Sequence, residues 1–295
     1  MRRWSTIAAA LALATLGVAA RQEPFRSGRT IVSVNVSVRS GTSPVAGLTA
    51  ADFRLTDNGA RQTIDAVSME TVPIDLTLLI DTSGTTSTSI RRVLGEAEGI
   101  ARRLRPTDRF RLLSIDTVVH ELLPMRNAAS HTWPARIPFN GASALYDALF
   151  AGLATPVEPD RRHLLIALTD GVDTISALDA AAVRDAAERS DVLLHIVAVT
   201  ADAAPPPVPP NWMPRRDADF DVLRDAARRT GGELHGGGQF GPEALRVVSA
   251  AMQDFRSSYV LRYSPTDAAS GWHALDVRVN RRDPWTTRAR RGYFR

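Results

Sequence analysis

From residue 74 onward, apolar runs of strand length alternate with stretches of helical periodicity. Segments that alternate in this way build a mostly parallel sheet with helices on both faces, which is a doubly wound α/β fold. We expect the run at residues 118–123 to lie antiparallel at the edge of this sheet. The predicted strands are residues 76–80, 110–115, 118–123, 164–168 and 193–199.

The predicted helices between these strands are amphipathic, with apolar residues repeating on one face. Asp179 immediately precedes one of them, residues 180–189, and is expected to cap its N-terminus. Another begins near Phe220 and is ended by Gly231 and Gly232. The remaining predicted helices cover residues 90–104, 145–153 and 245–255.

The segments before and after this α/β region have β character. Residues 32–38 alternate strictly between apolar and polar side chains, which indicates a half-buried strand. Asp57-Asn58-Gly59 is a hairpin signal because Asn and Gly tolerate positive φ. Each segment alone is too small to be stable, so we expect the two to pair in one small β domain. Its predicted strands are residues 32–38, 53–56, 62–67 (the return strand of the hairpin), 259–263, 272–280 and 287–293.

Oxygen-bearing side chains follow the ends of two predicted strands. Asp81 ends the first apolar run and is followed by a row of hydroxyls that includes Ser83 and Thr85. Asp170 and Gly171 end a second run in the same way. Ligands of such sheets bind outside the carboxyl ends of the strands. Hard cations such as Mg²⁺ prefer these oxygen ligands, although the first stretch alone also fits a helix N-cap.

Together with residues 140–149, these two stretches resemble the von Willebrand factor A domain. The metal-ion-dependent adhesion site of that family reads Asp-x-Ser-x-Ser, followed by a distant Thr and a distant Asp. Thr85 stands where Ser is usual in the family and Ser143 where Thr is usual, and both replacements keep a hydroxyl. The resemblance implies that the metal ligands are Asp81, Ser83, Thr85, Ser143 and Asp170.

The flanking β segments resemble a bacterial branch of the same family, the von Willebrand factor A-related or Acidobacterial-type domain family. The residues that carry this resemblance are Gly47-Leu48-Thr49, Asp52-Phe53, Asn58-Gly59 and the ending at 288–293. With them, the resemblance covers nearly all of the chain after its first residues.

The family resemblance implies a binding function. A divalent cation, Mg²⁺ with Mn²⁺ or Ca²⁺ as alternatives, would be held with one coordination position open. An acidic side chain of a partner protein, whose identity the sequence does not give, would complete the octahedron. A second hypothesis is an A domain that has lost its metal and serves as a scaffold, which the replacements at Thr85 and Ser143 favour.

A hydrolase is the third hypothesis and the least favoured. Asp81-Thr82-Ser83 differs from the Asp-Thr-Gly of aspartic proteases, which are mainly β proteins. The stretch around Ser143 lacks the second Gly of a Gly-x-Ser-x-Gly nucleophile elbow. We therefore expect no enzymatic activity. Asp173 is interpreted as a turn residue and His195 as a core histidine.

The N-terminus predicts export. Residues 1–20 combine two arginines, an apolar stretch and small residues before Arg21, as in a cleaved signal peptide, so we expect a periplasmic or extracellular protein. Membrane attachment is expected only if this segment is retained. The predicted organisation is a signal peptide (1–20), an N-terminal β unit (28–72), the A domain (73–255) and C-terminal β strands (256–295).

The composition of the chain excludes some kinds of site and argues against one class of partner. The chain has no cysteine, which rules out disulfides and thiolate metal sites. The net charge of +4 is carried without a single lysine, and we expect no nucleic-acid partner. The Pro-rich residues 203–214 are interpreted as a surface insertion.

Overall fold

The computed structural model of the chain describes residues 31–69, 72–83, 90–135, 137–138, 141–200, 218–239, 241–267, 269–281 and 283–295. Three predictions lie outside these residues: the signal peptide, the metal ligand Thr85 and the Pro-rich insertion at 203–214. Within the described part of the chain, no helix is long and apolar enough to cross a membrane.

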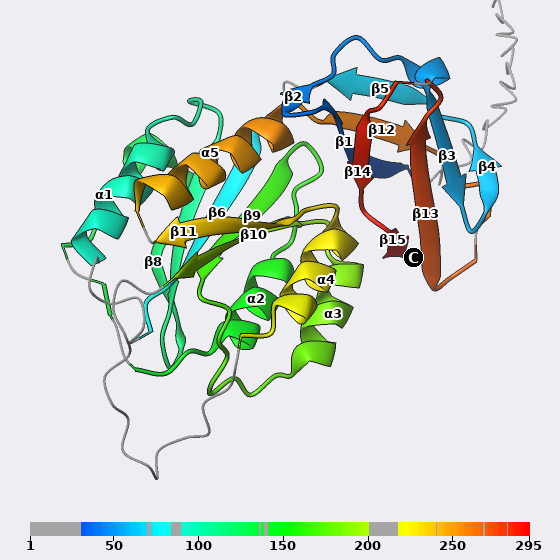
Figure 1. Ribbon diagram of the computed structural model, residues 1–295. Coiled ribbons are helices and arrows are strands. Elements are labelled where there is room, and N and C mark those ends of the chain that lie inside the picture. The colour runs from blue at the N-terminus through cyan, green and yellow to red at the C-terminus, as the bar shows by residue number, and fades with distance from the viewer. Residues whose placement is uncertain are drawn as a thin grey trace, which may run out of the picture. The chain divides into compact units, whose positions relative to one another are not determined.

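A six-stranded sheet forms the α/β part of the chain, in the order β11-β10-β9-β6-β7-β8 (Figure 1). All neighbours are parallel except β7 and β8, which pair antiparallel at one edge, as predicted. This is the strand order of a doubly wound sheet and confirms the predicted fold class. The strands are β6 (Ile74–Asp81), β7 (Arg109–Ile115), β8 (Val119–Asn127), β9 (Arg162–Thr169), β10 (Leu193–Thr200) and β11 (Leu234–Gln239).

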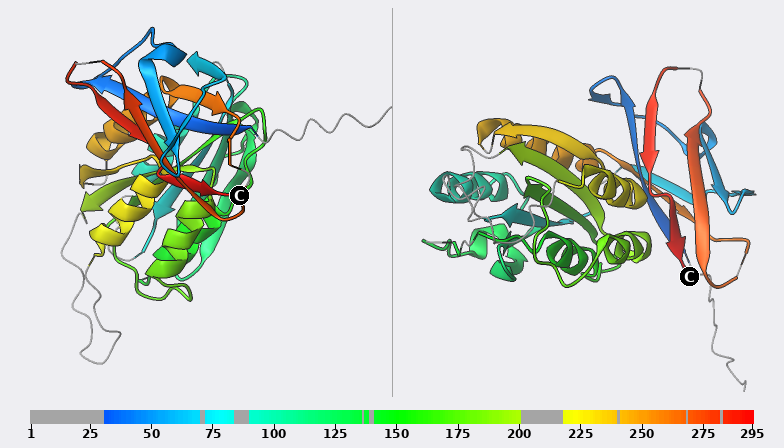
Figure 2. Two further views of the ribbon diagram at one scale, coloured as in Figure 1. Left: turned by 90° about the vertical axis from the view of Figure 1, so that its right-hand side faces the viewer. Right: turned by 60° about the horizontal axis from the view of Figure 1, so that its bottom comes forward.

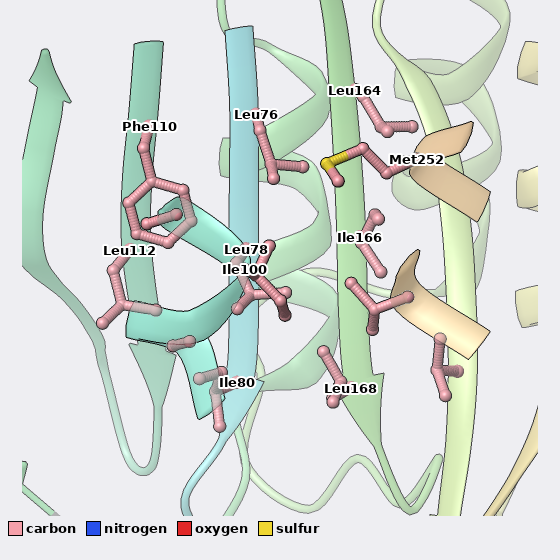
Figure 3. Packing of buried hydrophobic residues seen from close by; sticks show 14 of the residues in the cluster. Leu76, Leu78, Ile80, Ile100, Phe110, Leu112, Leu164, Ile166, Leu168 and Met252 are labelled. Carbon is pink, nitrogen blue, oxygen red and sulfur yellow. The ribbon is translucent and has the colours of Figure 1, made fainter. Parts of the chain in front are cut away.

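Helices cover both faces of this sheet (Figures 1 and 2). One face packs on α1 (Ile90–Ala101) and α5 (Pro242–Arg256). The other face packs on α2 (Leu145–Leu153), α3 (Ala180–Arg189) and α4 (Phe220–Thr230). Because side chains alternate along a strand, β6 contributes Leu78 to the first core and Leu79 to the second. Figure 3 shows the first of these cores between the strands and their helices.

The helix ends follow the predicted signals. Asp179 caps α3, since its carboxylate accepts a hydrogen bond of 2.9 Å from the Ala182 amide. Gly231 ends α4 with φ of +88°, the left-handed conformation that glycine adopts without strain. The Gly-rich strand β11 was not predicted, because Gly236, Gly237 and Gly238 give no alternation of side chains. A Cβ at Gly237 would lie 2.5 Å from the Val197 side chain, which explains the glycine there.

Strands from the two ends of the chain pair with each other, as predicted (Figure 2). One sheet has the order β14-β1-β12-β5, with β2 paired to β1. The other has the order β15-β13-β3-β4, and the apolar faces of both sheets share one core. The strands are β1 (Val32–Ser40), β2 (Ser43–Pro44), β3 (Phe53–Asp57), β4 (Ala60–Gln62), β5 (Ala66–Met69), β12 (Tyr259–Tyr263), β13 (Trp272–Val279), β14 (Thr286–Ala289) and β15 (Gly292–Phe294).

Two strand predictions in this part were wrong. The single return strand at 62–67 is replaced by β4, which completes the hairpin with β3, and by β5, which pairs with β12 of the other sheet. The single strand at 287–293 is divided into β14 and β15. The division falls at Arg290, whose buried guanidinium donates hydrogen bonds to the carbonyl oxygens of Ser190 and Gly292. Arg290 also pairs with Asp191, at 2.6 Å, so a buried and fully partnered arginine stands between β14 and β15.

Candidate metal centre

Asp81 and Asp170 leave the sheet next to each other, at its carboxyl edge. β6 and β9 are parallel neighbours, and Ile80 pairs with Leu168. β6 also lies between β9 and β7, so this is the point at which the strand order reverses. Doubly wound sheets bind their ligands at such a point. The positions of the two aspartates therefore match those predicted from the sequence.

The Asp81 carboxylate is buried and hydrogen-bonded on both oxygens. Oδ1 accepts a hydrogen bond of 3.0 Å from the Ser83 amide. Oδ2 accepts one of 2.8 Å from Thr169 Oγ1 and a longer one of 3.4 Å from Ser143 Oγ. The side chain of Asp81 is thus fixed in one orientation by residues of three segments. Ser83 and Ser143, two of the predicted ligands, lie against it.

Burial and, second to it, the negative charge of Asp170 together raise the pKa of Asp81 to about 6. The hydrogen bonds from Ser83 and Thr169 oppose this shift. Two carboxyl groups therefore lie close enough to repel each other in a site with little access to water. A bound cation would favour the ionised form of both groups. The electrostatics of the site thus suit a positively charged ligand.

Ser143 is positioned by the backbone on both sides of it. Its carbonyl oxygen accepts hydrogen bonds from the amides of Thr174 (2.9 Å) and Ile175 (3.2 Å). Its own amide donates to Thr174 Oγ1 at 2.7 Å. The next residue, Ala144, donates its amide to the carbonyl oxygen of Asp116 at 2.8 Å. The loop before α2 is therefore held between the segments that follow β9 and β7.

Asp170 lies at a turn whose shape depends on Gly171. Asp170 Oδ1 accepts a hydrogen bond of 3.0 Å from the Val172 amide. Gly171 has φ of +81°, and a Cβ there would lie 2.8 Å from the Phe220 ring. Its amide donates to Thr169 Oγ1 at 3.0 Å. Thr169 thus links the Asp170 turn to the Asp81 carboxylate.

Asp173 and Asp147 organise the segment beyond this turn. Asp173 Oδ1 accepts hydrogen bonds from the Tyr146 amide, at 3.2 Å, and from Ser176 Oγ. Asp147 on α2 accepts hydrogen bonds from the amides of Ala177 (3.0 Å) and Leu178 (2.9 Å). Asp173 therefore links the segment after β9 to the start of α2.

One residue that the motif does not include belongs to this site. Thr169 is fully buried, and its hydrogen bond to the Asp81 carboxylate is shorter than those from the Ser83 amide and the Ser143 hydroxyl. In the sequence it is one polar residue at the end of an apolar strand. Because β9 pairs with β6, Thr169 lies beside Asp81 and can donate this hydrogen bond. Thr82 lies in the first motif but bonds instead to the Ile115 carbonyl oxygen, at 2.9 Å.

Elsewhere in the described part of the chain, titratable residues form no second candidate metal centre. Among the described residues, no group of three or more His, Asp and Glu side chains is placed to hold a metal ion. His195 is buried in β10 and lies 2.9 Å from a ring nitrogen of His235, which agrees with its interpretation as a core histidine. The candidate centre has two carboxylates, and its further oxygen atoms come from hydroxyls.

No protein-family profile and no curated protein sequence matches the chain. Solved structures that it resembles include BatB from Bacteroides thetaiotaomicron, with 12% identity over 62% of this chain and 98% of that one, at a TM-score of 0.45. A von Willebrand factor type A protein from Catenulispora acidiphila has 12% identity over 90% of this chain and 72% of that one, at 0.46. The manganese-loaded TRAP protein of Plasmodium vivax has 14% identity over 80% and 95%, at 0.42.

These similarities are distant, and the description of the fold rests on the strand order and on the strand pairings. The antiparallel edge strand β8 and the adjacent ends of β6 and β9 are as predicted from the sequence, and the sheet order places those ends at the reversal of the strand order. The chain therefore has a von Willebrand factor A-like fold.

Proposed function

We propose that this chain is an exported, non-enzymatic A-domain protein that binds a partner protein through a divalent cation. The ligands are Asp81, Ser83, Thr85, Ser143 and Asp170. Mg²⁺ is the first choice of ion, with Mn²⁺ and Ca²⁺ as alternatives. The observation that carries the proposal is the meeting of Asp81, Ser83 and Ser143 next to Asp170, where the strand order reverses.

The donor set fits such an ion. Carboxylate and hydroxyl oxygens are ligands of hard cations, and Mg²⁺ is usually bound by only one or two carboxylates. When bound, the ion would supply a positive charge and a coordination position for an acidic side chain of the partner. The chain itself orients the ligands: Thr169 and Ser83 fix the Asp81 carboxylate, and the Thr174 segment fixes Ser143.

A metal-free scaffold is the alternative, and one observation favours it. Each oxygen of the Asp81 carboxylate already accepts a hydrogen bond from the protein. Such a network stabilises the loops whether or not an ion is present. A hydrolase stays the least favoured function, since the stretch around Ser143 lacks the second Gly of a nucleophile elbow.

Thermal unfolding in EDTA and then in Mg²⁺, Mn²⁺ or Ca²⁺ separates the two leading functions. An ion at 100 times its Kd adds about 2.7 kcal/mol to the free energy of unfolding. For a chain of this size, that corresponds to a rise of roughly 5–10 °C in Tm. The rise should be absent in Asp81→Ala and present in the control Asp185→Ala, which removes an exposed carboxylate on α3. If no ion at millimolar concentration raises Tm, the metal-free scaffold is the function that remains.

A further inference from the structure

Two large apolar side chains are exposed at the same edge of the sheet as the candidate metal centre. Val118 follows β7 and is 53% exposed, and Ile175 follows β9 and is 41% exposed. Isolated exposed apolar residues are common on protein surfaces. Val118 and Ile175, however, both lie beside one loop, the loop that carries Ser143. In the described part of the chain, the exposed large apolar residues are Ile31, Met69, Val118, Phe150, Ile175 and Phe294.

Hydrogen bonds link both of these residues to the Ser143 loop. The Ile175 amide donates directly to the Ser143 carbonyl oxygen, at 3.2 Å. The Val118 amide donates to Asp116 Oδ1, at 3.1 Å, and the carbonyl oxygen of Asp116 accepts from the Ala144 amide, at 2.8 Å. Because Ser143 Oγ bonds to Asp81, Ile175 and Val118 flank the candidate metal centre.

The backbone around Ile175 is held by hydrogen bonds on both sides. The residues on both sides of it are tied down, since Thr174 bonds to Ser143 through its amide and its hydroxyl. Ser176 Oγ bonds to Asp173, and Asp147 accepts the next two amides. An apolar side chain on an ordered backbone loses less conformational entropy when a partner binds than one on a loop that must first be ordered. Such a side chain is suited to contact a partner.

We infer that the partner presents an acidic side chain with a large aliphatic or aromatic neighbour. This inference rests on the proposed function, since without a cation the carboxylates at this edge would repel an acidic partner. The acidic group completes the coordination of the ion. Its apolar neighbour packs against Ile175 and Val118. Charge thus determines that the partner binds at this site, and the apolar contact determines which acidic segments bind.

A library of cyclised heptapeptides displayed on phage, selected on the whole protein in Mg²⁺, tests this inference. Bound phage are eluted with EDTA and sequenced. The selected sequence is then synthesised in two forms, one with its apolar neighbour and one with glycine in that place. The Kd of each peptide is measured for the wild type and for Ile175→Ser and Val118→Ser. Phe150→Ser, which replaces a 38% exposed side chain on α2, is the matched control.

The eluted sequences should join an Asp or Glu to a large apolar residue. Ile175→Ser and Val118→Ser should each weaken binding of the peptide that keeps its apolar neighbour by about tenfold. The glycine peptide and the Phe150→Ser protein should show no such loss. The Mg²⁺-dependent rise in Tm should be the same in all three variants, because none of them removes a metal ligand.

Two results would overturn the inference and leave the ion site standing. One is a set of acidic peptides without apolar preference. The other is an unchanged Kd in both Ile175→Ser and Val118→Ser, when each variant still shows the normal rise in Tm with Mg²⁺. Failure to select any EDTA-eluted peptide from a protein that shows the Mg²⁺ shift would also overturn it. A wild-type protein that shows no rise in Tm with Mg²⁺ is a separate result. It would contradict the proposed function and therefore also the inference that rests on it.

Discussion

Arg39 donates a hydrogen bond of 2.9 Å to Asp254 Oδ1 and so ties β1 to the last turn of α5. The same carboxylate accepts hydrogen bonds from Ser37 Oγ, at 2.8 Å, and from the guanidinium of Arg288 on β14. The Asp254 side chain is only 4% exposed. One buried acidic group on the α/β part therefore receives three donors from the two strands β1 and β14.

Asp254→Asn should destabilise the protein by about 1–3 kcal/mol, because it takes the carboxylate partner from Arg39 and one of two acidic partners from Arg288, which keeps Glu233. The measurement is the free energy of unfolding from urea titration. Asp276→Asn is the control, since Asp276 pairs with Arg278 at the surface, where the two side chains are 53% and 73% exposed. The control should cost less than about 1 kcal/mol. Equal losses in the two variants would contradict the role given to Asp254.

Thr169→Val should weaken Mg²⁺ binding by about 10- to 100-fold, as loss of a residue that orients a metal ligand does. The substitution keeps the side-chain shape and removes the donor to Asp81 Oδ2. Thr169→Ser keeps the hydroxyl and should bind Mg²⁺ nearly as the wild type does. Isothermal titration with Mg²⁺ gives both values of Kd. If Thr169→Val binds as tightly as Thr169→Ser, the hydroxyl does not position Asp81.

The residues of the candidate centre differ in how far the sequence alone predicts them. Asp81 and Asp170 are predictable because each ends an apolar run, and the end of a parallel strand fixes where the next side chain lies. Ser143 needed the family motif, because a loop residue has no periodicity of its own. Thr169 could not be predicted, since its partner Asp81 is contributed by a neighbouring strand. The division at Arg290 escaped prediction for the same reason: its partner Ser190 lies 100 residues away in the chain.

Gly171→Ala should destabilise the protein by about 1–3 kcal/mol. The φ of +81° strains any residue with a Cβ, and the new atom would lie 2.8 Å from the Phe220 ring. Gly99→Ala is the matched control, because Gly99 lies in α1 with nothing within 4 Å of an added Cβ. That substitution should stabilise the helix by about 0.5–1 kcal/mol. Urea unfolding of both variants gives the comparison, and a Gly171→Ala protein as stable as the wild type would exclude strain at this turn.

His163 makes the stability of the protein depend on pH. Its ring lies 2.8 Å from Thr77 Oγ1, between β9 and β6, and is nearly inaccessible to water. Burial lowers the pKa of His163 to about 4, and the positive charge of Arg111 acts in the same direction, although Asp75 opposes it. The unfolded chain binds this proton near pH 6.5. The folded chain therefore resists protonation between these two values, and stability is lost as the pH falls through this range.

Through His163, the free energy of unfolding should fall by about 3 kcal/mol between pH 6.5 and pH 4. Above pH 6.5 the imidazole is neutral in both states, so the free energy of unfolding should not change through this group. His163→Gln removes the titration and retains a side chain that can hydrogen-bond to Thr77. The measurement is urea unfolding of both proteins at a series of pH values from 7.5 to 4. The difference in stability between wild type and His163→Gln should shrink as the pH falls, because only the wild type is destabilised by protonation at this position. A difference that stays constant over the whole range would mean that His163 titrates alike in the folded and the unfolded chain, and that burial between β6 and β9 does not exclude its proton.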